Sequence, residues 1–291
     1  MESYPRNLIE FERQFSSENA CLEYLRQLRW RDGFVCPRCG GTRSWRVGAE
    51  LEECASCGRQ TSVTAGTIFQ DSKKPMSLWF HAMWHITSQK YGANALGLQR
   101  VLGLGSYRTA WAWLHKLRRA MVRPGRDRLA GAVEADETFV GAPKPGTRGR
   151  GASGKTLVLI AAQKDGRRTG RIRLRCIPNA SAEALEAALG EMVTPGATIC
   201  TDAWKGYNGL GSVGYIHEIV RPEVAVGENL LPRCHRVAGL VKRWLDGTIQ
   251  GAVRPQYLDY YLDEYTFRFN RRTSTHRGKL FYRLVEQAVA I

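Results

Sequence analysis

The sequence predicts an α/β protein: a mixed sheet with helices on its faces, preceded by a small metal-binding module and a helical region. Three observations support this. Two Cys-x-x-Cys pairs lie near the N-terminus, residues 77–122 repeat at helical spacing, and apolar or alternating runs typical of strands begin at residue 129. We expect four segments, an N-terminal helix in 1–30, a cysteine-rich ribbon in 31–72, helices in 73–128 and the sheet domain in 129–291.

Composition and charge favour a folded protein that binds a polyanion. The chain of 291 residues is 43% hydrophobic, and its net charge is +16. Such a field attracts nucleic acid or an anionic membrane. The sequence has no apolar run of transmembrane length, and Met1–Glu10 lacks the apolar stretch of a signal peptide. We therefore expect a cytoplasmic, nucleoid-associated protein that binds nucleic acid and no membrane.

The first predicted element is a helix over residues 16–30. Ser16 or Ser17 can cap its start, apolar residues recur at helical spacing, and Gly33 ends it.

The four cysteines that follow predict a zinc site. Two Cys-x-x-Cys pairs, with Gly40 and Gly58 directly after them, can wrap one tetrahedral ion through four thiolates. A redox pair or ordinary buried thiols are the alternative. A module this small needs its metal to fold, so we expect structural Zn²⁺ here. The ligands are Cys36, Cys39, Cys54 and Cys57.

Residues 77–122 predict three helices, of which the last two resemble a helix-turn-helix. ANALGLQRVLG ends at Gly103, and SYRTAWAWLHKLRRAM starts at a Ser106 cap. The second of these helices carries polar groups at its start and cations at its end, as a DNA-binding helix does, although a plain helical connector would share the pattern. The candidate DNA contacts are Tyr107, Arg108, Lys116, Arg118 and Arg119. The tryptophans of this region are predicted to lie in the core.

From residue 129 the pattern becomes that of a sheet. Three strand-like runs, a helix capped by Ser181, further strands at ATICTDAW and YIHEIV, and two C-terminal helices predict a mixed sheet covered by helices. Glu134 and Asp136 lie on one face of the first strand, and Asp202 follows the fourth. Adjacent strands can bring such carboxylates together as ligands for hard divalent cations, which serve in-line phosphoryl displacement.

These motifs together resemble a bacterial insertion-sequence transposase with an N-terminal zinc ribbon and an RNase H-like catalytic domain of the DDE type. The resemblance rests on CPRC and CASC, TAGTIFQDSK, VEADETFVG, TDAWKGY and HRVAGLVKRWLDGT…YLDEYTFRFNRR, and covers nearly the whole chain. It implies that residues 129–291 form an RNase H-like domain, and that the protein moves an element through its terminal inverted repeats.

Carried onto this sequence, the resemblance assigns the first two acids to Asp136 and Asp202. The third acid of the family opens a helix seven positions before a lysine; here the lysine is Lys242 and the residue is His235. The resemblance therefore implies an Asp-Asp-His-Lys variant, in which imidazole favours Mn²⁺ over Mg²⁺. Glu228 competes for the third place and Glu134 for the first. Asp202 and His235 can also be read as helix caps, and Lys242 as solvated charge.

We thus expect a metal-dependent DNA transposase that binds terminal inverted repeats, cleaves and transfers DNA strands, and acts as a homo-oligomer on DNA. Two alternatives stay open, a catalytically silent DNA-binding regulator and a nuclease or Holliday-junction resolvase of the same fold. A second group of DNA contacts is expected at the C-terminal helix end, where a solvated helix end is the alternative. These residues are Arg268, Asn270, Arg271 and Arg272.

Overall fold

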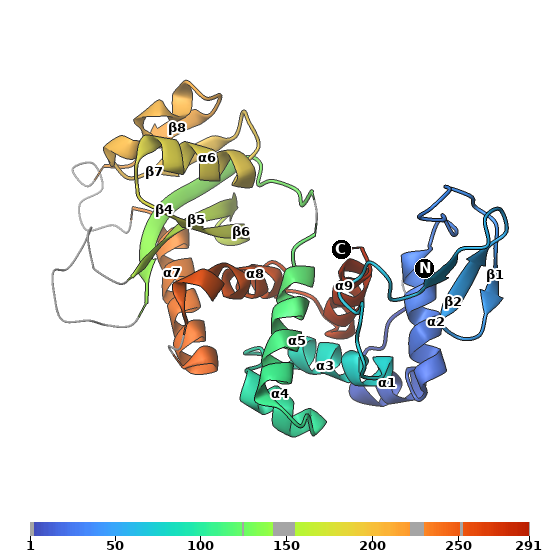
Figure 1. Ribbon diagram of the computed structural model, residues 1–291. Coiled ribbons are helices and arrows are strands. Elements are labelled where there is room, and N and C mark those ends of the chain that lie inside the picture. Colours follow the sequence, from blue (N-terminus) through green and yellow to red (C-terminus); the bar gives the residue numbers. More distant parts are fainter. Residues whose placement is uncertain (1–2, 124, 142–154, 222–229, 251–252, 291) are drawn as a thin grey trace. The chain divides into compact units, whose positions relative to one another are not determined.

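The computed structural model describes residues 3–123, 125–141, 155–221, 230–250 and 253–290 (Figure 1). Contacts divide the chain into two units, residues 1–124 with 273–291, and residues 125–272. The sheet domain expected at 129–291 thus extends into a segment that packs with the first unit. Within the described ranges, no helix is long and apolar enough to cross a membrane.

The first unit opens with two capped helices and a small sheet. α1 spans Leu8–Gln14 and α2 spans Glu18–Arg29, with Ser17 accepting from the Ala20 N–H at the α2 start, as its sequence predicts. The strands β1 (Ser44–Val47), β2 (Leu51–Cys54) and β3 (Gln60–Ser62) form an antiparallel sheet in the order β1-β2-β3. A buried ion pair between Arg26 and Glu52 ties α2 to β2.

Four helices complete this unit. α3 spans Met76–Ser88, α4 Ala95–Leu102, α5 Tyr107–Ala120 and α9 Gly278–Ala288. Gly103 ends α4 in the left-handed region at φ 61°, and Ser106 caps α5, both as predicted. Of the tryptophans, Trp79, Trp84 and Trp113 are buried, and the rings of Trp79 and Trp113 stack 3.8 Å apart.

The helices α1 and α9 were not predicted by the sequence analysis, and α9 matters more for the core. It returns from the far end of the chain and buries Phe281 among aromatic side chains of α1 and α3 and of the loop between α1 and α2. The ring centroids of Phe281 lie between 5.4 and 5.8 Å from those of Phe11, Phe15, Phe80 and Trp84. Its core role follows from long-range packing, which local periodicity does not report.

The second unit is built on a five-stranded mixed sheet of order β6-β5-β4-β7-β8. β4 (Ala132–Val140) pairs antiparallel with β5 (Thr156–Asp165), and β5 pairs antiparallel with β6 (Arg168–Ile177). On its other side β4 is parallel to β7 (Thr198–Thr201), which is parallel to β8 (Ile216–Ile219). As the sequence predicts, three strands come first and β7 and β8 lie within ATICTDAW and YIHEIV.

Helices cover both faces of this sheet (Figure 1). α6 (Ala182–Met192) and the 3-10 helix Lys205–Gly211 pack on one face, with Val133, Ala135 and Ile199. α7 (Pro232–Trp244) and α8 (Leu258–Phe269) pack on the other, with Val158, Ile160 and Cys200. Since neighbouring residues of a strand point to opposite faces, Glu134 and Asp136 belong to the α7 face.

Candidate functional site

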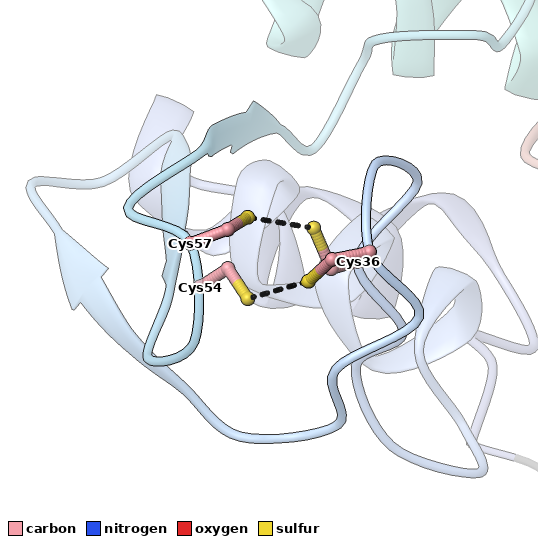
Figure 2. A group of neighbouring side chains, drawn as sticks. Cys36, Cys54 and Cys57 are labelled. Carbon is pink, nitrogen blue, oxygen red and sulfur yellow. Dashed lines mark hydrogen bonds between the residues drawn. The ribbon is translucent and has the colours of Figure 1, made fainter.

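The four cysteines of the ribbon form a metal centre. Cys36 and Cys39 precede β1, Cys54 ends β2, and Cys57 lies in the next turn; all four sulfur atoms lie within 4.8 Å of one another. The Cys36–Cys57 and Cys39–Cys54 sulfur distances are 3.7 and 3.6 Å (Figure 2). A tetrahedron with metal–sulfur bonds of about 2.3 Å has edges of about 3.8 Å, so the thiolates fit zinc.

The backbone around this centre depends on glycine. In each knuckle the glycine N–H closes a turn onto the first cysteine carbonyl, Gly40 to Cys36 at 3.0 Å and Gly58 to Cys54 at 2.9 Å. Both glycines have positive φ, as tight turns around an ion require. At Gly41 a side chain would lie 3.2 Å from the Cys54 sulfur, so only glycine leaves the ligands room.

The carboxylates of Asp136 and Asp202 lie at neighbouring positions of the sheet. Glu134 of β4 is paired with Cys200 of the parallel strand β7, and each aspartate follows two residues later. Burial raises the pKa of Asp136 to about 6, with further contributions from Glu137 and Asp202, while His235 opposes the shift. The carboxyl group of Asp136 therefore resists ionisation until positive charge comes near.

His235 supplies a third polar group from α7. Its Nε2 lies 3.3 Å from Oδ2 of Asp136, and half of the imidazole is exposed. Lys242, at the surface two turns further along α7, has a pKa lowered by desolvation and by Lys155, whereas Asp136 acts to raise it. The helix thus presents an imidazole beside Asp136 and an ammonium further along.

These residues suit a divalent cation by the chemistry of their donors. Two carboxylates and an imidazole are ligands for Mg²⁺ or Mn²⁺. Within the described residues, however, a group of three or more ligating side chains within 4.8 Å of one another occurs at the four cysteines and not here. The observed contact joins His235 to Asp136 alone, and Asp202 directs Oδ1 to the Trp204 N–H at 3.0 Å.

Glu228 and Glu134 compete with the assigned residues as metal ligands. Glu228 lies outside the described residues. Glu134 is 2% exposed, and both its oxygens accept from the first turn of α7: the Arg233 N–H at 2.7 Å, the Cys234 N–H at 3.2 Å and the Arg233 guanidinium at 2.7 Å. The sequence analysis weighed Glu134 only as a ligand; its partner Arg233 was missed, since the two are far apart in sequence.

The expected contacts on α5 separate into surface and core residues. Tyr107, Arg108 and Arg119 are exposed, and the Lys116 ammonium lies 6.0 Å from the Trp79 ring. Arg118, by contrast, is 1% exposed and its guanidinium donates to the Ala93 carbonyl. The expectation that Arg118 contacts phosphate is therefore wrong, because its side chain points into the interior of the first unit.

The expected contacts at the C-terminal end of α8 are largely engaged within the protein. Arg268 pairs with the buried carboxylate of Glu264 at 2.9 Å, and Asn270 bonds both the N–H and the carbonyl of Ile172 in the edge strand β6. Arg271 lies over the Phe267 ring; Arg272, which is exposed, bonds the Thr169 carbonyl. For Arg268 and Asn270 the structure corrects the prediction, since tertiary contacts occupy both side chains.

Comparisons with known proteins agree with the ribbon and the sheet unit. Residues 128–270 match the family model of the ISXO2-like transposase domain, and residues 16–60 match that of the transposase zinc-ribbon domain. The chain is also similar to a Halobacterium salinarum protein named "Uncharacterized protein in transposable element ISH50", with 27% identity over 280 residues, 87% of this chain and 93% of the relative. The first segment includes Asp136, Asp202 and His235; the second includes all four cysteines.

Removing a zinc ligand should unfold the ribbon. We expect one zinc per wild-type chain and none in Cys54→Ala, because zinc binding contributes on the order of 10 kcal/mol to such modules. Elemental analysis gives the zinc content, and amide exchange of residues 31–70 reports the fold. Cys176→Ala, outside the ribbon, is the control and should keep its zinc. Elemental analysis that finds no zinc in the purified wild-type protein would contradict the assignment.

Two adjacent arginines of α5 should behave differently. Arg118→Ala should lower the free energy of unfolding by about 2 kcal/mol, because it removes a buried charged donor. Arg119→Ala should leave stability unchanged but weaken DNA binding and reduce the slope of log affinity against log salt by about 0.9 if Arg119 contacts one phosphate. Denaturant titration and binding isotherms at several salt concentrations measure both; the reverse pattern would refute this division of roles.

Proposed function

We propose, from the premise that this chain carries the zinc ribbon and the ISXO2-like domain of an insertion-sequence transposase, that it cleaves DNA at the ends of its element and joins them to target DNA. The observation that carries the proposal is that Asp136 lies on β4 and Asp202 directly follows the neighbouring strand β7, with His235 3.3 Å from Asp136. Carboxylates placed this way serve phosphodiester chemistry.

The reaction has two displacements. In the first, water attacks a phosphodiester at the element end, the bond from phosphorus to the 3′ oxygen breaks, and a 3′-OH is freed. In the second, that 3′-OH attacks a target phosphodiester and releases a target 3′-OH. Divalent ions, when bound, activate the attacking oxygen and stabilise the charge that develops on the leaving oxygen.

Each candidate residue has a role in this scheme. Asp136, Asp202 and His235 would hold Mg²⁺ or Mn²⁺. Lys242, exposed on α7 two turns beyond His235, would steady a phosphate as a point charge. The zinc ribbon and the helix-turn-helix of α4 and α5 would bind the terminal inverted repeats, with Tyr107 and Arg108 at the exposed start of α5. A homo-oligomer would hold two element ends together.

A catalytically silent DNA-binding regulator is the second candidate. The observation that favours it is His235, which stands where a third carboxylate would otherwise complete an all-acid site. The two candidates share DNA binding and differ in metal-dependent cleavage, so one experiment separates them.

Removing one carboxylate charge should stop cleavage. We expect Asp136→Asn and Asp202→Asn to lower the cleavage rate of a repeat-bearing duplex at least about 100-fold, because each removes a metal-binding charge at nearly constant size. DNA affinity should change less than about twofold, since both variants keep the α5 cations proposed to bind DNA. Asp246→Asn, exposed beyond α7, is the matched control. If neither Mg²⁺ nor Mn²⁺ supports cleavage of the repeat-bearing duplex by the wild-type protein, the catalytically silent regulator replaces the transposase as the proposed function.

The imidazole should set the preferred metal. We expect wild-type protein to cleave faster with Mn²⁺ than with Mg²⁺, because nitrogen ligands suit the softer ion. His235→Glu should shift the preference toward Mg²⁺, and His235→Ala should cleave poorly with both. Cleavage rates measured across a titration of each metal decide this. Normal cleavage by His235→Ala together with loss in Glu228→Ala would move the third ligand to Glu228.

A further inference from the structure

The start of α7 is joined to β4 by a single buried carboxylate. Glu134, 2% exposed, accepts from the N–H groups of Arg233 and Cys234 through Oε2, and from the Arg233 guanidinium through Oε1. The three donor–acceptor distances are 2.7, 3.2 and 2.7 Å. Two helix residues therefore share one acid of the neighbouring strand.

This contact does the work of a helix cap. The first N–H groups of a helix have no intrahelical acceptor and carry partial positive charge. α2 and α6 meet that need locally through Ser17 and Ser181, but α7 follows Leu231, whose side chain makes no capping bond. Glu134 supplies the missing acceptor from the adjacent strand β4, and its negative charge suits the helix dipole.

Arg233 extends the connection to a third element. Its guanidinium also donates to the Gly166 carbonyl at 2.7 Å and the Arg168 carbonyl at 3.2 Å, around the turn from β5 to β6. The cation compensates the buried charge of Glu134, which would otherwise be costly. The first turn of α7 is thus tied to β4 and to the β5–β6 turn together.

We propose that Glu134 is a positioning residue, which holds the first turn of α7 so that His235 stays against Asp136. The geometry is direct. The side chains of Glu134 and Asp136 project from the same face of β4, two positions apart. Glu134 accepts hydrogen bonds from the N–H groups of residues 233 and 234 of α7. The next residue, His235, lies 3.3 Å from Asp136. The structural part stands alone, while its consequence for catalysis rests on the proposed function.

The test compares Glu134→Ala, Glu134→Gln and wild type as full-length protein, with Glu191→Gln as a matched control on the exposed side of α6. Hydrogen exchange of amides 233–236, without DNA or added metal, reports the placement of the helix start. Single-turnover cleavage and DNA affinity report the consequence. Thermal unfolding shows whether each variant is folded.

We expect Glu134→Ala to exchange faster in the first turn of α7 and to cleave about 100-fold more slowly, because small misplacements at a reacting centre cost about that much. DNA affinity should change less than about twofold, since the α5 cations proposed to bind DNA are unchanged. Glu134→Gln should recover part of both losses, since its amide oxygen can still accept the backbone N–H bonds. Should Glu134→Ala not fold, the glutamine variant carries the test.

Three results would overturn the inference. Exchange equal to wild type in both variants would show that Glu134 does not hold the helix. Faster exchange with unchanged cleavage would make the contact structural only. Slow cleavage with unchanged exchange, equally severe in both variants, would make Glu134 a metal ligand. Failure of the wild-type protein to cleave would end the proposed function, and exchange alone would then support or refute the placement.

Discussion

The parallel pairing of β4 with β7 is the constraint on which the candidate site depends. It sets Ala132–Glu134 against Thr198–Cys200 and so brings two chain segments, distant in sequence, side by side in the sheet with a fixed register. A slip of one residue would turn either aspartate to the opposite face, toward α6. The hydrophobic cores on both faces hold that register, because Val133 and Ile199 pack on one side and Cys200 on the other.

The same strand also places the helix that completes the site. β4 alternates apolar residues toward α6 with the acids Glu134 and Asp136 toward α7. Glu134 accepts hydrogen bonds from the start of α7, whereas Asp136 faces the imidazole of His235. These two carboxylates, two residues apart, therefore differ in chemistry. The Arg233 guanidinium of α7 pairs with Glu134. Asp136 is instead buried near Glu137 and Asp202, and its pKa is raised.

The positive charge of the chain serves two purposes. Some cations stay on the surface, among them Arg108 and Arg119 of α5, and can meet a polyanion. Others hold the fold, since Arg26 pairs with Glu52, Arg118 reaches the Ala93 carbonyl and Arg268 pairs with Glu264. The count of 43 lysine and arginine side chains thus overstates the number of cations that a polyanion can meet.

The sequence by itself determined the four cysteines of the ribbon, the strands of the sheet and the caps of α2, α5 and α6. Those features depend on local spacing, where a motif or an alternation is complete within a few residues. The resemblance to a transposase family supplied Asp136, Asp202 and His235 as candidate residues. Tertiary structure alone decided that α9 joins the first unit, that Arg118, Arg268 and Asn270 are engaged internally, and that Glu134 caps α7. In each case the partner lies too far along the chain for periodicity to report it, and an identical side chain reads as surface charge or as core depending on what packs against it.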